Sequence, residues 1–296
     1  MKVHVAEEAG FCFGVRRALD IIDDLCEKNQ DIQIYGQLIH NNSTLQKLAA
    51  KGIHTIESLD ALDSHAKLVI RTHGIPLEIQ NKFNDTGVDY VDATCPLVKK
   101  LHLIAASYAN ASDNDEHQTR FVIVGDKNHP EIIAAASYAG NATVVDSEEE
   151  ARHIPYSETI AVMAQTTLDA DHFKKIVSLL EEKTANLKVF NTICRATTTR
   201  QEAVKKLAPL VDFVVVVGGK NSSNTRKLFH IARARNENTF HIESHEELTS
   251  TASTWLEQVR HFESVGIAAG ASTPPEEIEK IKLFFNNINS NRVKEI

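Results

Sequence analysis

The chain repeats one pattern of strands, helices and polar loops three times, and this repeat constrains its fold more than any other feature. Three of its four cysteines stand where a strand-like run ends and a helix-like run begins, about 90 residues apart. The preceding runs are KVHVAEEAGF for Cys12, VDYVDAT for Cys95 and LKVFNTI for Cys194. One thiol per repeat predicts a metal site built on threefold pseudosymmetry.

Each repeat continues in the same order after its cysteine and the helix that follows. A second strand ends in a polar loop, a short strand ends at a serine, and a last strand leads to another polar loop. The serines are Ser58, Ser147 and Ser244, and each can cap a helix. Glu150 and Glu247 follow the second and third serine at the third position, which predicts two capping boxes.

Strands that alternate with helices of this length predict βαβ units, and therefore parallel sheets with right-handed crossovers. We expect an α/β fold in which three pseudosymmetric lobes surround a central site, because ligands bind beyond the carboxyl ends of parallel strands. The expected lobes are residues 13–95, 96–193 and 194–280, with residues 1–12 packed on the third lobe. Residues 281–296 are expected to form a C-terminal covering arm with a loose end.

Composition and charge exclude several classes of function. The formal net charge of -8 gives no attraction for nucleic acid or an anionic membrane surface. No run of about 18 apolar residues is present, and Glu7 and Glu8 stand where a secretory signal would need apolar residues, so we expect a cytoplasmic protein. Asn221 stands where a Walker A motif would have serine or threonine, which argues against a nucleotide cofactor. Residues 110–118 are expected to form a surface loop.

The four cysteines are too sparse for a disulfide framework, so metal or redox chemistry is the better interpretation. A helix N-terminus stabilises a thiolate, which suits Cys12, Cys95 and Cys194. Cys26 has apolar neighbours at helical spacing and is assigned to the core. Three thiolates leave one metal position open, which fits zinc or a [4Fe–4S] cluster with one iron free of protein ligands. The absence of an H-E-x-x-H motif favours iron–sulfur.

The polar loops are rich in hydrogen-bond donors and poor in fixed charges. Such a set suits a phosphate or diphosphate, because a protonated histidine donates from both ring nitrogens and helix N-termini add backbone amides. Glu131, in the first turn of a predicted helix, is the best candidate acid. The donors are His40, His73, His129, Thr166, Ser222, Asn224 and Ser272.

An ordered set of motifs along the chain matches a known family. The motifs are GFCFGVRRA, IHN, THGIP, DATCPLV, HPE, QTT, CRATTTRQ, GGKNSSN and GAST. With them the chain resembles the 4-hydroxy-3-methylbut-2-enyl diphosphate reductase family, which catalyses the last step of the methylerythritol phosphate route to isoprenoids. The resemblance implies reductive removal of an allylic hydroxyl with two electrons, giving isopentenyl diphosphate and dimethylallyl diphosphate.

The resemblance also implies roles for individual residues. Cys12, Cys95 and Cys194 would hold a [4Fe–4S] cluster with one open iron, while Glu131 would relay protons and Thr166 would help to position the substrate. An external electron donor such as ferredoxin or flavodoxin is implied. The residues that would bind the diphosphate are His40, His73, His129, Ser222, Ser223, Asn224 and Ser272.

One position departs from the family pattern. Ala134 stands where the family usually has glycine, and we expect only a small change in the packing of its helix. Three other functions remain open as alternatives: an iron–sulfur hydro-lyase, which would need no reductant; a cluster-based redox sensor, which would have no affinity for diphosphate; and a zinc hydrolase.

Overall fold

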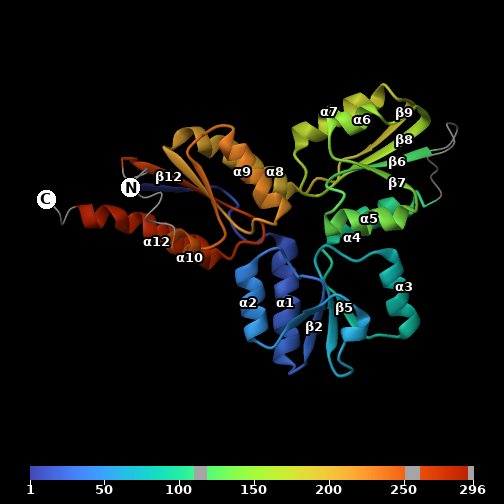
Figure 1. Ribbon diagram of the computed structural model, residues 1–296, viewed down its shortest axis with the longest axis horizontal. Helices are drawn as coiled ribbons and strands as arrows, with labels where there is room; N and C mark the ends of the chain where they lie inside the picture. Colours follow the sequence, from blue (N-terminus) through green and yellow to red (C-terminus); the bar gives the residue numbers. More distant parts are fainter. Residues whose placement is uncertain (110–118, 251–260, 293–296) are drawn as a thin grey trace. The chain divides into compact units, whose positions relative to one another are not determined.

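The computed structural model describes residues 1–109, 119–250 and 261–292 (Figure 1). These residues contain three four-stranded sheets, and all strand pairs in them are parallel. The predicted α/β class and its threefold repeat are confirmed. The surface loop expected at residues 110–118 and the loose end expected from residue 293 lie outside the described residues.

The first sheet has the strand order β3-β2-β4-β5. Gln33 lies opposite both His54 and Leu68 in this register. Its strands are β2 (Ile32–Tyr35), β3 (His54–Ile56), β4 (Lys67–Ile70) and β5 (Tyr90–Asp92). The helices in this part of the chain are α1 (Phe13–Glu27), α2 (Asn42–Ala50), the 3-10 helix η1 (Leu59–Ala61) and α3 (Leu77–Thr86).

The second sheet repeats the same topology with the order β7-β6-β8-β9. Its strands are β6 (Thr119–Val124), β7 (Ala142–Val145), β8 (Ser157–Ala164) and β9 (Thr184–Phe190). The helices are α4 (Pro96–Ala106), α5 (Pro130–Ala139), α6 (Glu148–Arg152) and α7 (Ala170–Glu181). Side chains from α4 and α5 cover one face of this sheet, and side chains from α6 and α7 cover the other.

The third sheet has the order β1-β12-β10-β11, so its edge strand comes from the N-terminus of the chain. Strand β1 pairs with β12 at the position that β5 and β9 occupy in the other two sheets. The strands are β1 (Lys2–Val5), β10 (Phe213–Val217), β11 (Thr239–Ile242) and β12 (Ser264–Ala269). The helices are α8 (Arg195–Leu207), the 3-10 helix η2 (Ala208–Leu210), α9 (Ser223–Arg233), α10 (His245–Ser250) and α12 (Pro275–Arg292).

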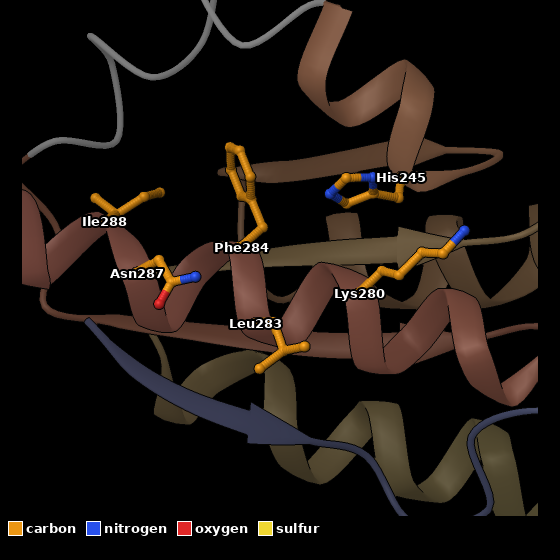
Figure 2. A pocket seen from close by; sticks show the side chains of 6 residues that line it. All are labelled: His245, Lys280, Leu283, Phe284, Asn287 and Ile288. Carbon is orange, nitrogen blue, oxygen red and sulfur yellow. The ribbon is translucent and has the colours of Figure 1, made fainter.

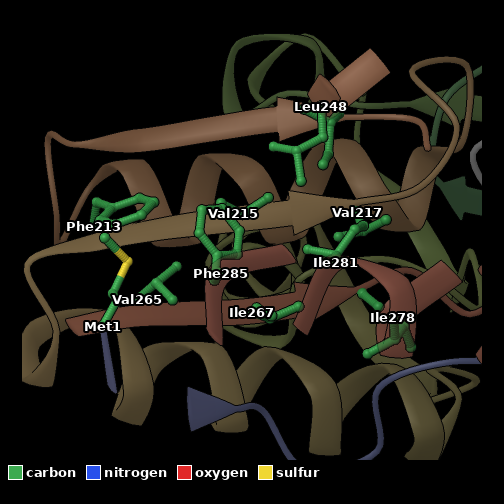
Figure 3. Close-up of a cluster of buried hydrophobic side chains, with 12 residues drawn as sticks. Met1, Phe213, Val215, Val217, Leu248, Val265, Ile267, Ile278, Ile281 and Phe285 are labelled. Carbon is green, nitrogen blue, oxygen red and sulfur yellow. The ribbon is translucent and has the colours of Figure 1, made fainter. Parts of the chain in front are cut away.

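The central strand β10 of the third sheet is an uninterrupted apolar run because helices cover both of its faces. Every residue of β10, FVVVV, is buried. Phe213 and Val265 pack with Phe285 of α12 on one face of the third sheet (Figure 3). Val214 and Val216 point to the opposite face, where they join residues of α8 and α9. This burial explains why period-2 patterning is absent from this strand.

Helix α12 differs from the covering arm expected after residue 280. It begins at Pro275, and its residues Ile278, Ile281 and Phe285 belong to the core of the third sheet. The boundary expected between residues 280 and 281 therefore falls inside one continuous helix. The reason is the spacing of these apolar residues, which places them on one helical face.

Two of the three capping serines form the expected boxes with a glutamate. Ser147 Oγ accepts from the Glu150 amide at 3.2 Å, and the Glu150 carboxylate accepts from the Asp146 amide at 2.8 Å. The same pair of contacts recurs at the start of α10, where Glu247 bonds back to the amide of Glu243. In both cases the glutamate carboxylate accepts from the amide of the residue that precedes the capping serine, and not from the amide of the serine itself.

The chain divides into two compact units. Unit 1 comprises residues 1–16, 39–51 and 195–296, and unit 2 comprises residues 17–38 and 52–194. The first and second sheets thus belong to unit 2, while α2 belongs to unit 1 with the third sheet. The lobe boundaries expected from the sequence stay predictions. Within the described residues, no helix has the length and apolar character that crossing a membrane requires.

Candidate active site

The backbone holds the three expected cluster cysteines in equivalent ways. Each stands just before a helix, α1, α4 or α8, and each side chain is partly exposed. In each case the cysteine amide donates to the carbonyl of the second residue after a strand, and the three strands, β12, β4 and β8, occupy equivalent places in their sheets. The three bonds run from Cys12 to Ala271 (2.9 Å), from Cys95 to Thr72 (3.0 Å) and from Cys194 to Thr166 (2.9 Å).

Cys26 does not share this arrangement. It lies near the end of α1 and is partly exposed, whereas Ile22 and Leu25 on the same helix are buried. The prediction of a core cysteine was right about the helix face and wrong about this side chain. The error arises because Cys26 lies at the margin of the apolar face, in the last turn of the helix.

The loop that leads to Cys95 is fixed by Asp92. Its carboxylate accepts from the Thr94 amide at 2.8 Å and pairs with Lys99 at 2.6 Å. Burial would raise the pKa of Asp92, but the hydrogen bonds from Lys99 and Thr94 outweigh it and the pKa is lowered. Arg17 donates to the carbonyls of Asp92 and Thr94, both at 3.4 Å. Asp92 and Arg17 were not among the predicted site residues, although they lie in the motifs DATCPLV and GFCFGVRRA.

In unit 2 a buried carboxylate is bound to a threonine. Glu131 is 2% exposed, and its two oxygens accept from the amide and the hydroxyl of Thr166, both at 2.7 Å. The Thr166 carbonyl in turn accepts from the Cys194 amide. One residue therefore connects the candidate acid with the backbone of a candidate cluster ligand.

The two histidines of unit 2 are neighbours. The rings of His73 and His129 lie edge to face, with centroids 5.3 Å apart. His129 caps α5, and its Nδ1 accepts from the Glu131 amide at 3.2 Å. This contact requires an unprotonated Nδ1, so in this geometry His129 donates to a ligand from Nε2 alone. The expectation that it donates from both nitrogens does not apply to the arrangement observed.

Unit 1 contains the remaining expected residues. Ser272 Oγ donates to the His40 carbonyl at 3.1 Å. A Cβ at Gly219 would lie 2.6 Å from the same carbonyl oxygen, so glycine is required for this close approach. Ser272 follows Ala271, the residue that binds the Cys12 amide. The segment around His40 is thus packed between two loops of the third sheet.

The SSN triplet lies at the start of α9. Ser222 caps this helix, with its hydroxyl accepting from the Thr225 amide at 3.4 Å, and Ser223 is 4% exposed. Asn224 is 5% exposed, and neither polar atom of its amide has a hydrogen-bond partner among the described residues. A buried amide of this kind at a helix N-terminus indicates a bound anion or another polar ligand.

The structure therefore gathers the predicted residues in two groups, one in each unit. Unit 1 contains Cys12, His40, Ser222, Ser223, Asn224 and Ser272, and unit 2 contains His73, Cys95, His129, Glu131, Thr166 and Cys194. Arg200 was overlooked: it is 2% exposed and donates from Nη2 to the Gly10 carbonyl at 2.7 Å. Its place in the CRATTTRQ run was the available signal.

A surface pocket of about 420 Å³ lies elsewhere in unit 1, between α10 and α12 (Figure 2). It is lined mainly by apolar side chains, with His245 and Lys280 as its ionisable groups. None of the expected site residues lines it.

Comparison with known proteins identifies the family. A sequence model of the family described as LytB protein matches residues 3–286. The chain belongs to the LytB family. The 4-hydroxy-3-methylbut-2-enyl diphosphate reductase of Thermoanaerobacter pseudethanolicus is 42% identical over 286 residues, which cover 95% of each chain. The same-named protein of Campylobacter jejuni is 39% identical over 293 residues, 98% of this chain and 100% of the relative.

Two solved structures agree with this membership of the LytB family. One is a structure of (E)-4-hydroxy-3-methyl-but-2-enyl diphosphate reductase, the terminal enzyme of the non-mevalonate pathway, with 37% identity, a TM-score of 0.66 and 100% of both chains covered. The other is E-1-hydroxy-2-methyl-but-2-enyl-4-diphosphate reductase from Plasmodium falciparum. It is 26% identical, with a TM-score of 0.85, and the match covers 96% of this chain and 87% of that one.

Proposed function

We propose that this LytB-family protein is an iron–sulfur reductase that removes the hydroxyl of 4-hydroxy-3-methylbut-2-enyl diphosphate, giving isopentenyl and dimethylallyl diphosphate. Relatives named for this activity align over nearly their whole length. The observation that carries the proposal is the chain of contacts from Glu131 through Thr166 to Cys194. It joins a buried acid to a candidate metal ligand, as proton-coupled reduction at a metal needs.

Cys12, Cys95 and Cys194 would hold a [4Fe–4S] cluster. Their side chains are partly exposed, and each lies at a helix start that a backbone hydrogen bond from the cysteine amide fixes. The donor set, three thiolates at helix N-termini, fits iron–sulfur better than zinc, because catalytic zinc sites use histidine or carboxylate ligands more often. When bound, such a cluster supplies single electrons and an open iron that polarises the hydroxyl oxygen.

The side chains would hold the substrate and deliver protons. Glu131 and Thr166 form a path on which a proton moves from the carboxyl group to the threonine hydroxyl and on to the departing hydroxyl, which leaves as water. His73 and His129 would donate to the diphosphate from unit 2.

The unit 1 residues would bind the diphosphate through neutral donors. Asn224 offers an unpaired buried amide at the N-terminus of α9, where the helix dipole favours an anion. His40, Ser222, Ser223 and Ser272 would complete this set. Their hydroxyl and imidazole groups fix the substrate in one orientation, which is the positioning contribution to the rate.

The two electrons would come from a protein donor such as ferredoxin or flavodoxin. This expectation, and the cytoplasmic location, stay predictions. The chain's small-molecule substrate would be an allylic diphosphate.

The test is purification without oxygen, followed by assays of iron, sulfide and turnover with and without a chemical reductant. We expect iron and sulfide in equal amounts, turnover only with reductant, and a change in the electron paramagnetic resonance spectrum of the reduced protein when substrate is added. Turnover without reductant would instead indicate a hydro-lyase. Zinc in place of iron would indicate a hydrolase, and absence of diphosphate binding would indicate a redox sensor.

A further inference from the structure

His102 is a buried histidine with no role in the proposed chemistry. It lies on α4 with 9% of its surface exposed, and its ring stacks on Tyr138 of α5 with centroids 4.5 Å apart and planes at 14°. Helix α4 begins directly after Cys95, and α5 begins directly after His129. The stack therefore joins two helices whose N-termini carry expected site residues.

The edge of the same ring lies against the turn that contains His73. Gly74 has φ of +73°, and its amide and carbonyl both bond to Arg71, which closes the turn. A methyl group added at Gly74 would overlap Cε1 of His102 and lie 3.1 Å from Nε2. It would also lie 3.3 Å from Cγ2 of Thr94. The turn and the ring are thus in contact with no room for a side chain between them.

The properties of His102 indicate a role in shape rather than in charge. Its Nε2 has no hydrogen-bond partner among the described residues. Burial lowers the pKa of His102 to about 4, so the ring is neutral near pH 7. A neutral ring has no positive charge with which to bind an anion, and an Nε2 without a hydrogen-bond partner does not relay protons. What remains is a flat, rigid body that fits between Tyr138 and Gly74.

We propose that His102 is a positioning residue, a wedge between Tyr138 and Gly74 that sets the His73 turn against His129. The ring centroids of His73 and His129 are 5.3 Å apart. A displacement of the turn by a fraction of this distance therefore changes how the two rings together bind a ligand. The inference rests on the proposed function, because it assigns these two histidines to the diphosphate.

The decisive experiment is a double-mutant cycle on the anaerobically purified holoenzyme. Gly74→Ala is combined with His102→Ala, and KM, kcat and the affinity for inorganic diphosphate are measured. Gly74→Ala has two costs, the strained φ and the collision with the ring, and only the collision depends on His102. Gly87→Ala is the matched control, because Gly87 has φ of +66° and nothing within 4 Å of an added Cβ.

We expect Gly74→Ala to raise KM and weaken diphosphate binding by about tenfold or more, while Gly87→Ala leaves both unchanged. In the His102→Ala background, Gly74→Ala should have a much smaller effect. An equal effect of Gly74→Ala in both backgrounds overturns the inference. A loss of folded protein would instead lower the apparent kcat at constant KM, and that result would also count against a positioning role.

His102→Phe provides a second test should Gly74→Ala not fold. Phenylalanine keeps the stack on Tyr138, but its larger ring extends further toward Gly74, so KM should rise while the melting temperature stays close to that of the wild type. A wild-type KM in this variant overturns the inference. If the wild type itself neither binds diphosphate nor turns over the substrate, the proposed function fails and the inference fails with it.

Discussion

At the scale of single residues, the active site depends on side chains whose partners are backbone groups of neighbouring loops. Thr166 is the clearest case, since its amide, hydroxyl and carbonyl all bond to other expected site residues. The loss of one such group moves several others. An isosteric substitution at such a residue should therefore change the chemistry of the site, whereas a substitution that alters the shape of the side chain should also change the geometry of the site.

Glu131→Gln tests the proton path with little change in shape. Glutamine can accept from the Thr166 amide and donate to its hydroxyl, so the loop and substrate binding should be kept, while the transferable proton is lost. Turnover should fall by about 10²- to 10⁴-fold with unchanged iron content. Steady-state kinetics and iron assays measure this, with Glu149→Gln, at an exposed position of α6, as the control. Retained turnover would remove Glu131 from the path.

His102 predicts a pH dependence of folding. The unfolded chain protonates this residue below its ordinary pKa of 6.5, whereas the folded protein does not until about pH 4. Between these two pH values the unfolded state therefore binds more protons than the folded state. The contribution of His102 to the free energy of unfolding is complete above pH 6.5, and it is lost as the pH falls toward 4. The loss is on the order of 3 kcal/mol.

Urea unfolding of the wild type and His102→Phe between pH 7 and pH 4.5 measures this effect. The wild type should lose more stability over the window than the variant, whatever their difference at pH 7. Parallel pH profiles would mean that His102 is protonated equally in the folded and unfolded states.

At the scale of elements, helix starts and strand ends carry the site. Each cysteine precedes a helix, and Asn41, His129 and Ser222 cap the equivalent helices α2, α5 and α9. His129 and Ser222 are themselves expected diphosphate residues, and Asn41 directly follows a third, His40. In the proposed function the backbone groups that begin each helix would also donate to the diphosphate, which would couple site geometry to helix stability.

Ala134→Gly tests the one departure from the family pattern. Ala134 lies in α5 with none of its surface exposed, so its methyl group is fully accommodated. Glycine should lower the free energy of unfolding by about 1 kcal/mol through backbone entropy. Chemical denaturation measures the change, with Ala136→Gly on the same helix as the control. A stabilised Ala134→Gly variant would mean that the methyl group overpacks the helix, contrary to our expectation.

At the scale of the whole molecule, the threefold repeat distributes the three expected cluster cysteines over the chain. Cys12 belongs to the third sheet's part of the chain and follows β1, while Cys95 and Cys194 follow β5 and β9. The edge strand β1 closes the third sheet in place of a strand that would otherwise come after β12. Each repeat therefore contains one cysteine at the equivalent place, directly before a helix.

Serine substitutions compare the four cysteines directly. Cys12→Ser, Cys95→Ser and Cys194→Ser should each strongly lower the iron and sulfide content of protein purified without oxygen, since each removes one of three thiolate ligands. Cys26→Ser should retain both, because Cys26 lies on α1 away from a helix start. Iron bound equally well by one of the three variants would exclude that cysteine from the site.

The sequence by itself determined the repeat, the parallel α/β class, the capping boxes and the types of residue at the site. These depend on local patterns: apolar runs, caps and the order of polar loops. Only the tertiary structure decided that β1 completes the third sheet, that α12 belongs to its core, and that Arg17 and Arg200 hold the cysteine loops. Those contacts join residues far apart in the chain, so no local pattern specifies them. The fit of His102 against Gly74 belongs to the same class, because it depends on how closely two separate segments pack.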